Sequence, residues 1–177
     1  MIDFLSNITQ RLETLDIAYM ISGSIALNIY TIPRMTRDVD VVILLEEKNV
    51  DLFLKAFESD FYHHKPSIIE EVRRKGMFNL IDTKTSFKID FIVRKEQPYR
   101  IKEFERRIRT DVLGFDTWVV SQEDLIISKI IWIQELQSEK QMEDISHLLE
   151  NDDVDMDYVH FWIKTLHLNT FNLLKNE

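Results

Sequence analysis

Apolar and polar residues alternate along the chain with two periods, and these periods divide it into helices and strands. Apolar residues three or four positions apart between residues 3 and 15 predict an amphipathic helix. Further helices are predicted over residues 24–31, 49–59, 67–74, 98–107, 121–137, 139–150 and, as one or two helices, 156–174. Strands are predicted over residues 17–21, 38–45, 61–62, 77–82, 86–93, 110–113 and 115–120.

This order of elements predicts an α+β fold. A small mixed β-sheet is flanked by helices and followed by a C-terminal helical segment. We expect an α/β core over residues 1–120 and a helical segment over residues 121–177 that packs on the core. Ser121, with Asp124 three residues later, is close to the capping-box pattern and marks the change to helix.

The composition is that of one domain, or of one core with a small appendage. The chain has 177 residues, 45% of them apolar, which is ample for a packed core. It has no cysteine, which excludes disulfides, thiolate catalysis and cysteine-ligated zinc. No apolar run is long enough to span a bilayer, and the N-terminus lacks the pattern of a signal peptide. We therefore expect a soluble cytoplasmic protein with no membrane partner.

The net charge of −9 disfavours nonspecific binding to nucleic acid or to anionic membranes. Basic residues gather over residues 94–109 and acidic residues over residues 152–157. Two solvated faces are the simpler explanation, and a basic region that binds a triphosphate or an RNA acceptor is the alternative. The five histidines have no spacing typical of a metal cluster. Trp118, Trp132 and Trp162 are expected in the core rather than as base-stacking platforms.

Two carboxylates start the strand predicted from residue 38. Asp38 and Asp40 alternate with Val39 and Val41, so the two carboxylates share one face of the strand. Like charges this close repel each other, and a divalent cation is the usual compensation. The alternative is that both acids end a strand at a solvent-exposed edge, which needs no ligand.

Upstream, Ser22, Gly23 and Ser24 precede a segment with helical spacing. Free backbone N–H groups, a hydroxyl and the positive helix end favour an anion at this turn. Ser24 is also suited to be a plain helix N-cap, and the two roles are compatible. Residues 31–37 form a loop, because Pro33 cannot continue a helix. A phosphate cradle followed by a carboxylate pair indicates a nucleoside triphosphate.

Three motifs follow one another in the order Gly23-Ser24, Asp38-Val39-Asp40 and Asp90, the last within FKIDFIV. This order resembles that of the nucleotidyltransferases of the DNA polymerase β-like superfamily. The segments RMTRDVDVVI and SQEDLIISKIIW…QMEDISHLL are similar to the small prokaryotic members. These include minimal single-domain enzymes and the toxins of abortive-infection (type IV toxin–antitoxin) systems. The chain is shorter than those toxins, which puts their acceptor-binding extension in doubt.

The resemblance implies that Asp38, Asp40 and Asp90 hold two Mg²⁺ ions. Magnesium prefers carboxylate and phosphate oxygens, and two ions would brace the α-phosphate while pyrophosphate leaves. Asp90 is also suited to take the proton from the acceptor hydroxyl. Gly23 and Ser24 are assigned to the β- and γ-phosphates. For Asp90, as for the Asp pair, a solvent-exposed strand end is the alternative.

Four further residues are candidates for support of this site. Arg34 and Arg37 bracket the loop before the Asp pair, where they reach phosphate oxygens or balance the acids. Lys129 shares a helix face with apolar residues, which is unusual for a lysine. In the related toxins a lysine here is followed by an aspartate on the next helix, the place of Asp144. Lys129 then binds a phosphate with Asp144 in support, or the two form a structural ion pair between helices.

The expected function is Mg²⁺-dependent transfer of a nucleoside monophosphate from an NTP such as ATP to an acceptor hydroxyl. The acceptor is RNA, a protein or a small molecule, and pyrophosphate is released. A role in toxin–antitoxin or phage-defence systems, with a cognate toxin or antitoxin as partner, is implied by the resemblance alone. A catalytically inactive nucleotide- or protein-binding module is the main alternative. A metal-dependent phosphohydrolase, which releases phosphate instead of pyrophosphate, is another.

Overall fold

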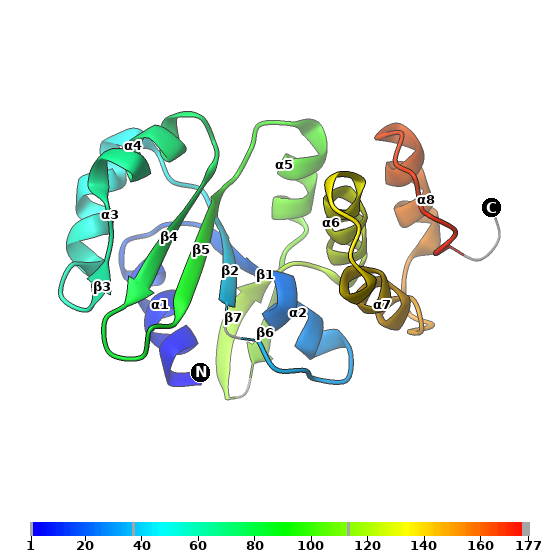
Figure 1. Ribbon diagram of the computed structural model, residues 1–177, viewed down its shortest axis with the longest axis horizontal. Helices are drawn as coiled ribbons and strands as arrows, with labels where there is room; N and C mark the ends of the chain where they lie inside the picture. The colour runs from blue at the N-terminus through cyan, green and yellow to red at the C-terminus, as the bar shows by residue number, and fades with distance from the viewer. Residues whose placement is uncertain (1, 37, 113, 175–177) are drawn as a thin grey trace.

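A mixed sheet of seven strands forms the centre of the computed structural model, which describes residues 2–36, 38–112 and 114–174 (Figure 1). The strands are β1 (Tyr19–Ser22), β2 (Asp38–Ile43), β3 (Phe61–Tyr62), β4 (Met77–Asp82), β5 (Lys88–Val93), β6 (Ile108–Val112) and β7 (Phe115–Val119). Their order across the sheet is β3-β4-β5-β2-β1-β7-β6. The helices are α1 (Ile2–Thr14), α2 (Gly23–Tyr30), α3 (Val50–Phe57), α4 (Lys65–Arg73), α5 (Pro98–Glu105), α6 (Gln122–Glu135), α7 (Glu139–Leu148) and α8 (Met156–Thr165).

The pairing of the strands makes the sheet mixed, which confirms the predicted α+β class. β2 runs parallel to β5 and antiparallel to β1, while β4 runs antiparallel to β5. β1 pairs in parallel with β7, which forms an antiparallel hairpin with β6. The parallel pair β2–β5 joins strands whose connection includes two helices and two strands, so local pattern alone does not place them together.

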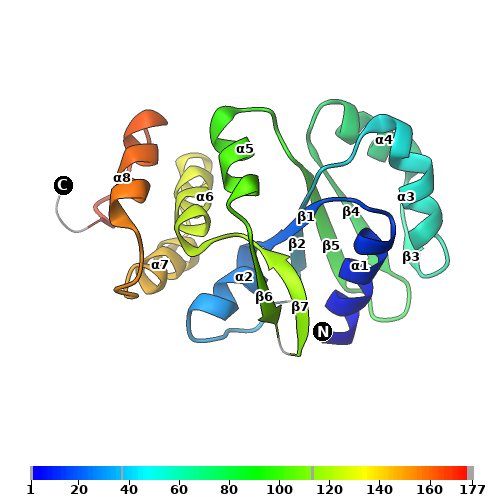
Figure 2. The ribbon, with the colours of Figure 1, turned by 180° about the vertical axis from the view of Figure 1, so that it is seen from behind.

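One face of the sheet carries the main core. Side chains at alternate positions of β2 and β5 are fully buried there. They pack under α1 and α3, which lie in front of the sheet in Figure 2. Phe53 on α3 contacts Phe91 on β5 and Phe78 on β4, with ring centroids 5.2 and 5.8 Å apart. Large aromatic side chains bury much apolar area, so this cluster anchors α3 to the sheet.

The other face is only partly covered. α2 packs on β1 and β2, α6 packs on α2, and α7 and α8 pack on α6. Figure 1 shows no helix in front of β4 and β5. The predicted division of the chain at residue 120 stays a prediction. In the described part of the chain, no helix combines the length and apolar character needed to cross a bilayer.

Two predictions about the fold are wrong. Residues 156–174 were predicted to form one or two helices, but α8 ends at Thr165 and no helix follows over residues 166–174, where His167 has a positive φ of 53° and Gln134 bonds the backbone of Asn169. Trp132, expected in the core, is 57% exposed. Trp132 lies in the last turn of α6, where its side chain is exposed although Leu125, seven residues earlier on the same helix face, is buried.

Candidate active site

The register between β2 and β5 brings two predicted site residues together. Asp40 is paired with Asp90, so both carboxylates leave the sheet on the same face. Asp40 also pairs with Ser22 on β1, and Asp90 pairs with Asn79 on β4. A polar row therefore crosses four adjacent strands, on the face opposite to the aromatic core.

The third predicted carboxylate is accompanied by a lysine. Asp38 lies two residues before Asp40, on the same face of β2, and is paired with Lys88 on β5. The Lys88 Nζ atom lies 2.8 Å from Oδ2 of Asp90 and 3.8 Å from Oδ1 of Asp38. The hydrogen bond to Asp90 raises the pKa of Lys88. An ammonium group thus offsets part of the negative charge of the three carboxylates.

Asp40 lies at the centre of this charge. Burial raises its pKa, and the nearby carboxylates of Asp90 and Asp38 raise it further. Lys129 and Lys88 act in the opposite direction. Keeping Asp40 ionised therefore costs free energy, and a cation bound beside this carboxylate would lower that cost.

Gly23 is in direct contact with this carboxylate. It opens α2 in a left-handed conformation with φ of +59°. A Cβ atom at this position would lie 1.9 Å from Oδ2 of Asp40, which no side chain tolerates. Glycine is needed here both for its backbone conformation and for the space that the Asp40 carboxylate occupies.

Replacing Gly23 with alanine is expected to displace the Asp40 carboxylate and to lower the free energy of unfolding by about 1–3 kcal/mol. Gly114→Ala is the matched control, because Gly114 also has a positive φ (101°) but a Cβ there meets nothing within 4 Å. Urea unfolding and nucleotide transfer measure both variants. Gly23→Ala should lose transfer while Gly114→Ala retains it, and equal transfer in the two variants would contradict the collision with Asp40.

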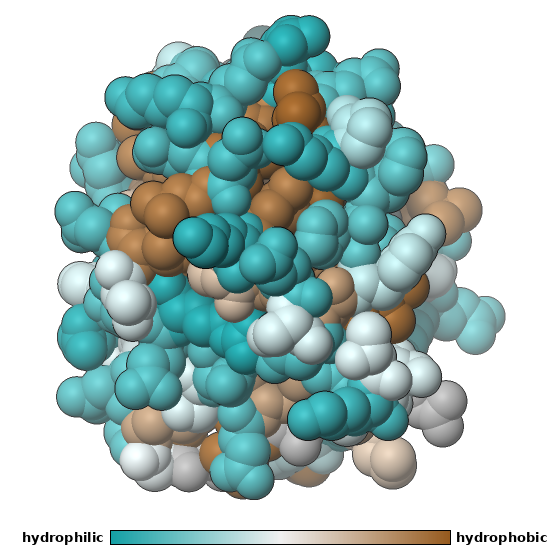
Figure 3. All heavy atoms as spheres, turned by 90° about the vertical axis from the view of Figure 1, so that its left-hand side faces the viewer, coloured by the Kyte–Doolittle hydropathy of each residue, from teal (hydrophilic) through white to brown (hydrophobic). Residues whose placement is uncertain are grey.

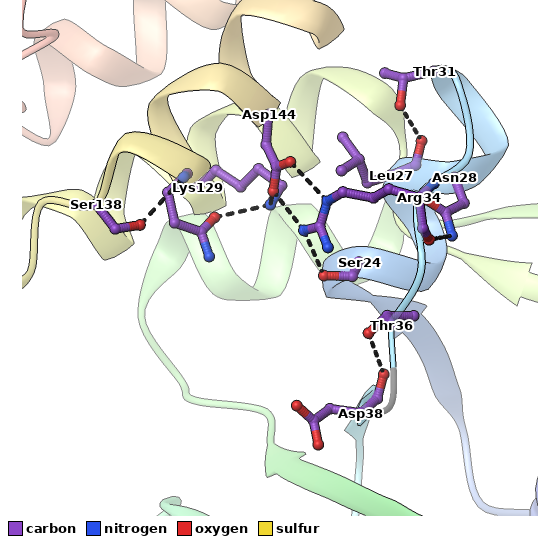
Figure 4. A network of polar contacts seen from close by, with 11 residues as sticks. Ser24, Leu27, Asn28, Thr31, Arg34, Thr36, Asp38, Lys129, Ser138 and Asp144 are labelled. Carbon is purple, nitrogen blue, oxygen red and sulfur yellow. Dashed lines mark hydrogen bonds and ion pairs between the residues drawn. The ribbon is translucent and has the colours of Figure 1, made fainter.

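Ser24 is joined to the C-terminal helices by an arginine (Figure 4). The Nη2 atom of Arg34 donates to Oγ of Ser24 at 2.9 Å. Nε and Nη2 of Arg34 donate to the two oxygens of Asp144 at 3.0 and 2.9 Å. The interpretation of Ser24 as a plain N-cap is wrong, since the N-cap of α2 is Ser22 and no side chain caps it. Arg37 lies outside the described residues.

The position of Arg34 is fixed by its own loop. The side chain of Asn28 donates to the carbonyl oxygen of Arg34 at 2.9 Å and accepts from its N–H at 3.0 Å. This reciprocal pair holds the loop between α2 and β2 against α2. Asn28 was not among the residues predicted from the sequence, although an Asn close to a proline-containing loop is a recognised local signal.

Lys129 is buried, with 6% of its surface exposed. Its Nζ atom donates to Oδ2 of Asp144 at 2.8 Å and to Oε1 of Gln141 at 2.9 Å. Burial lowers the pKa of Lys129, whereas Arg34 and Lys129 together overcome the effect of burial on Asp144 and lower its pKa. The geometry is that of the structural ion pair between helices. A direct contact of Lys129 with a phosphate stays a prediction.

A cleft of about 460 Å³ opens over the carboxylates. Its lining comes from β2, β5, the start of α2, the loop after α2 and the first turn of α7: Ser24, Arg34, Met35, Thr36, Asp38, Asp40, Asp90, Lys140 and Gln141. Lys140 and Gln141 were missed by sequence analysis. The available signal was helical spacing, because Lys140 precedes Asp144 by four residues.

The donor set of the cleft fits a metal ion that is shared with a ligand. Within the described ranges, no three or more His, Cys, Asp or Glu side chains are grouped to hold a metal ion. Asp40 and Asp90 are nevertheless adjacent, and their charges repel. Magnesium is commonly bound by one or two carboxylates together with substrate phosphates and water. The pair therefore suits a cation that arrives with a phosphate ligand.

The basic region over residues 94–109 is used within the fold. Arg100 pairs with Glu103, and Arg106 pairs with Glu123 and Asp124. The described lining of the cleft includes none of these arginines. The idea that this region binds the triphosphate in the cleft is therefore not supported, and internal ion pairs account for much of its charge.

Comparisons with known proteins give a consistent result. The sequence model of a family described as "Nucleotidyltransferase of unknown function (DUF6036)" matches residues 1–173. No curated protein matches the chain. Among solved structures, an antigenic nucleotidyltransferase-like protein from Paracoccidioides brasiliensis is 19% identical with a TM-score of 0.53 over 89% of this chain and 84% of its own.

An antibiotic-resistance factor and an antibiotic adenylyltransferase have a similar fold. The antibiotic-resistance factor ANT(2'')-Ia is 12% identical, with a TM-score of 0.61 over 92% of this chain and 89% of its own. The lincosamide antibiotic adenylyltransferase LnuA is 13% identical, with a TM-score of 0.55 over 81% of this chain and 93% of its own. At these identities the likeness concerns the fold alone.

Proposed function

The chain belongs to the DUF6036 family of nucleotidyltransferases, and we propose that it transfers a nucleoside monophosphate from an NTP to an acceptor hydroxyl with Mg²⁺. The observation that carries this proposal is the in-register pair Asp40–Asp90 beside the Gly23 turn. A carboxylate pair and a tight turn at a helix start are the two parts that a metal-bound triphosphate needs.

The nucleotide is assigned to the side of the cleft formed by the β1–α2 turn. Ser24 lines the cleft beside the backbone N–H groups that open α2, and its hydroxyl accepts from Arg34. Arg34 lines the cleft but is paired with Asp144. Lys140 also lines the cleft, and it forms no ion pair with any residue that the structure describes. We assign Lys140 to the β- or γ-phosphate.

The chemistry is an in-line displacement at the α-phosphorus. The acceptor oxygen forms a bond to phosphorus, the bond between the α-phosphorus and the bridging oxygen breaks, and pyrophosphate leaves. Asp90 accepts the proton of the acceptor hydroxyl and returns it to solvent. Asp40 and Asp90, with Asp38 beside them on the same face of β2, would hold Mg²⁺ together with the phosphates of the NTP, and the ion would supply charge stabilisation at the attacking and leaving oxygens.

Replacing Lys140 with alanine is expected to raise the KM for the NTP about tenfold with a smaller change in kcat, because a charge-assisted contact to the phosphates is lost. Lys55→Ala is the matched control, since Lys55 is exposed on α3, away from the cleft. Steady-state kinetics of pyrophosphate release measures both variants. An unchanged KM in Lys140→Ala would remove Lys140 from the phosphate site.

Transfer from α-labelled ATP, GTP, CTP and UTP with Mg²⁺ tests the function. We expect label to enter one fraction of a cell lysate with stoichiometric pyrophosphate, and Asp40→Asn to abolish this. Release of free phosphate instead would indicate a phosphohydrolase. Neither label transfer nor stabilisation against heat by any NTP would indicate an inactive module of the same fold.

We also propose a role in a toxin–antitoxin or phage-defence system, on the sequence resemblance to such toxins. Induced expression of the active chain is expected to slow growth, and expression of Asp40→Asn is not. Equal growth of the two strains would contradict a toxin role while leaving the enzymatic proposal untouched.

A further inference from the structure

The sheet face beside Asp90 is uncovered. On β4, Met77, Asn79 and Ile81 point away from the aromatic core, and Met77 and Ile81 are 49% and 36% exposed. Tyr62 on β3 pairs with Ile81 and is 65% exposed. In Figure 1 no helix lies in front of these strands, whereas α1 and α3 cover their other side in Figure 2. Tyr62 and Ile81 are neighbours on paired strands, and contiguous exposed apolar side chains, unlike scattered ones, indicate a candidate binding surface.

The strand register connects this face to the carboxylates without a gap. Asn79 is paired with Asp90, and Ile81 is paired with Lys88. Neighbouring strands lie about 4.8 Å apart. Tyr62 on β3 is two strands from β5, so it lies about 10 Å from the strand that carries Asp90 and Lys88. A small molecule lying on Tyr62 and Ile81 therefore reaches Asp90 with a hydroxyl group.

The geometry of the reaction assigns the acceptor to this side. The attacking oxygen and the leaving pyrophosphate lie on opposite sides of the α-phosphorus. The phosphates are assigned to the turn of Gly23 and Ser24, which lies on the β1 side of Asp40. The acceptor then approaches from the β5–β4 side, where Asp90 is placed to take its proton and Asn79 to bind a neighbouring polar group.

The charge of the surface argues against RNA. Lys88, on this face of β5, already contacts Asp90 and lies near Asp38, so its charge is used within the protein. Binding of RNA requires several phosphates to be neutralised, and the chain has a net charge of −9. A stable protein interface needs about 800 Å² on each partner, which is more than the side chains of Tyr62, Met77 and Ile81 provide. Figure 3 views the adjoining end of the molecule near α3 and α4, not the face of β4 and β5, and shows apolar side chains interrupted by hydrophilic ones at that end.

We propose that the acceptor is a small hydroxyl compound, neutral or cationic, whose apolar or aromatic surface lies on Tyr62, Met77 and Ile81. Its hydroxyl lies between Asn79 and Asp90. This inference rests on the proposed nucleotide transfer and names the class of its acceptor.

The experiment uses the full chain, an α-labelled NTP, Mg²⁺, and separate small-molecule, RNA and protein fractions of a cell lysate. We expect label in the small-molecule fraction. Ile81→Glu should lower this transfer at least tenfold, because it places a carboxylate on the apolar floor beside Asp90. The stabilisation of Ile81→Glu against heat by the NTP should equal that of the native chain. Leu52→Glu, at an exposed apolar position on α3, should transfer normally.

A second pair of variants separates contact from folding. Tyr62→Ala should lower transfer into the small-molecule fraction, and Tyr62→Phe should retain it, because the aromatic face makes the contact. Label confined to RNA or protein, or unchanged transfer by Ile81→Glu and Tyr62→Ala, would overturn the acceptor assignment alone. If the native chain shows neither transfer nor release of pyrophosphate, both the proposed function and the acceptor assignment are overturned.

Discussion

Replacing Asp40 with asparagine is expected to lower nucleotide transfer by roughly 10³-fold, the loss that follows removal of one group that stabilises transition-state charge. Asp40 is the central carboxylate of the row, in contact with the Gly23 turn and paired with Asp90. Asparagine keeps the shape of the side chain and removes the charge. The measurement is label transfer from an NTP at saturating Mg²⁺.

The same variant is expected to fold at least as stably as the native chain without metal. Burial and the carboxylates of Asp90 and Asp38 raise the pKa of Asp40, so its ionised form at neutral pH destabilises the fold. Thermal unfolding should therefore show an equal or higher Tm, and stabilisation by Mn²⁺ with an NTP should be lost. Asp116→Asn is the control, since Asp116 is exposed on β7. A lower Tm with retained transfer would contradict the assignment.

The largest effect on stability is expected from Asp144→Ala, at about 3–5 kcal/mol in the free energy of unfolding. Lys129 is 6% exposed, and its Nζ atom lies 2.8 Å from Asp144. Without Asp144 the ammonium group is buried with no opposite charge in contact, and Arg34 loses both of its bonds to α7. Urea unfolding of the two proteins measures the difference.

The double variant Asp144→Ala with Lys129→Met is the control for this pair. Removing both charges avoids an unpaired buried ion, so most of the lost stability should return. Because the pKa of Asp144 is lowered, its contribution is complete above the ordinary pKa of an aspartate. It should be lost as the pH falls through the lower, folded-state value. A cost below about 1 kcal/mol for Asp144→Ala would contradict a tightly coupled pair.

The local sequence pattern determined most of the secondary structure of this nucleotidyltransferase and the face on which its first two carboxylates lie. Alternation along β2 placed Asp38 and Asp40 on one face, and the positions of the strands and most helices followed from the two periods. The cap of α6 was also predicted, since the Ser121 side chain accepts from the N–H of Asp124. These features depend on residues a few positions apart, so they are visible in a single sequence.

The contacts that build the site were decided by the tertiary structure. The adjacency of β2 and β5, the contact of Gly23 with Asp40 and the facing of Lys140 into the cleft join segments far apart in the chain. The exposure of Trp132 was likewise decided by the tertiary structure. The sequence by itself determined which side chains share a face of each element. Which faces meet, and which stay open, depends on strand order, register and the reach of neighbouring helices, because these are set by packing over the whole chain.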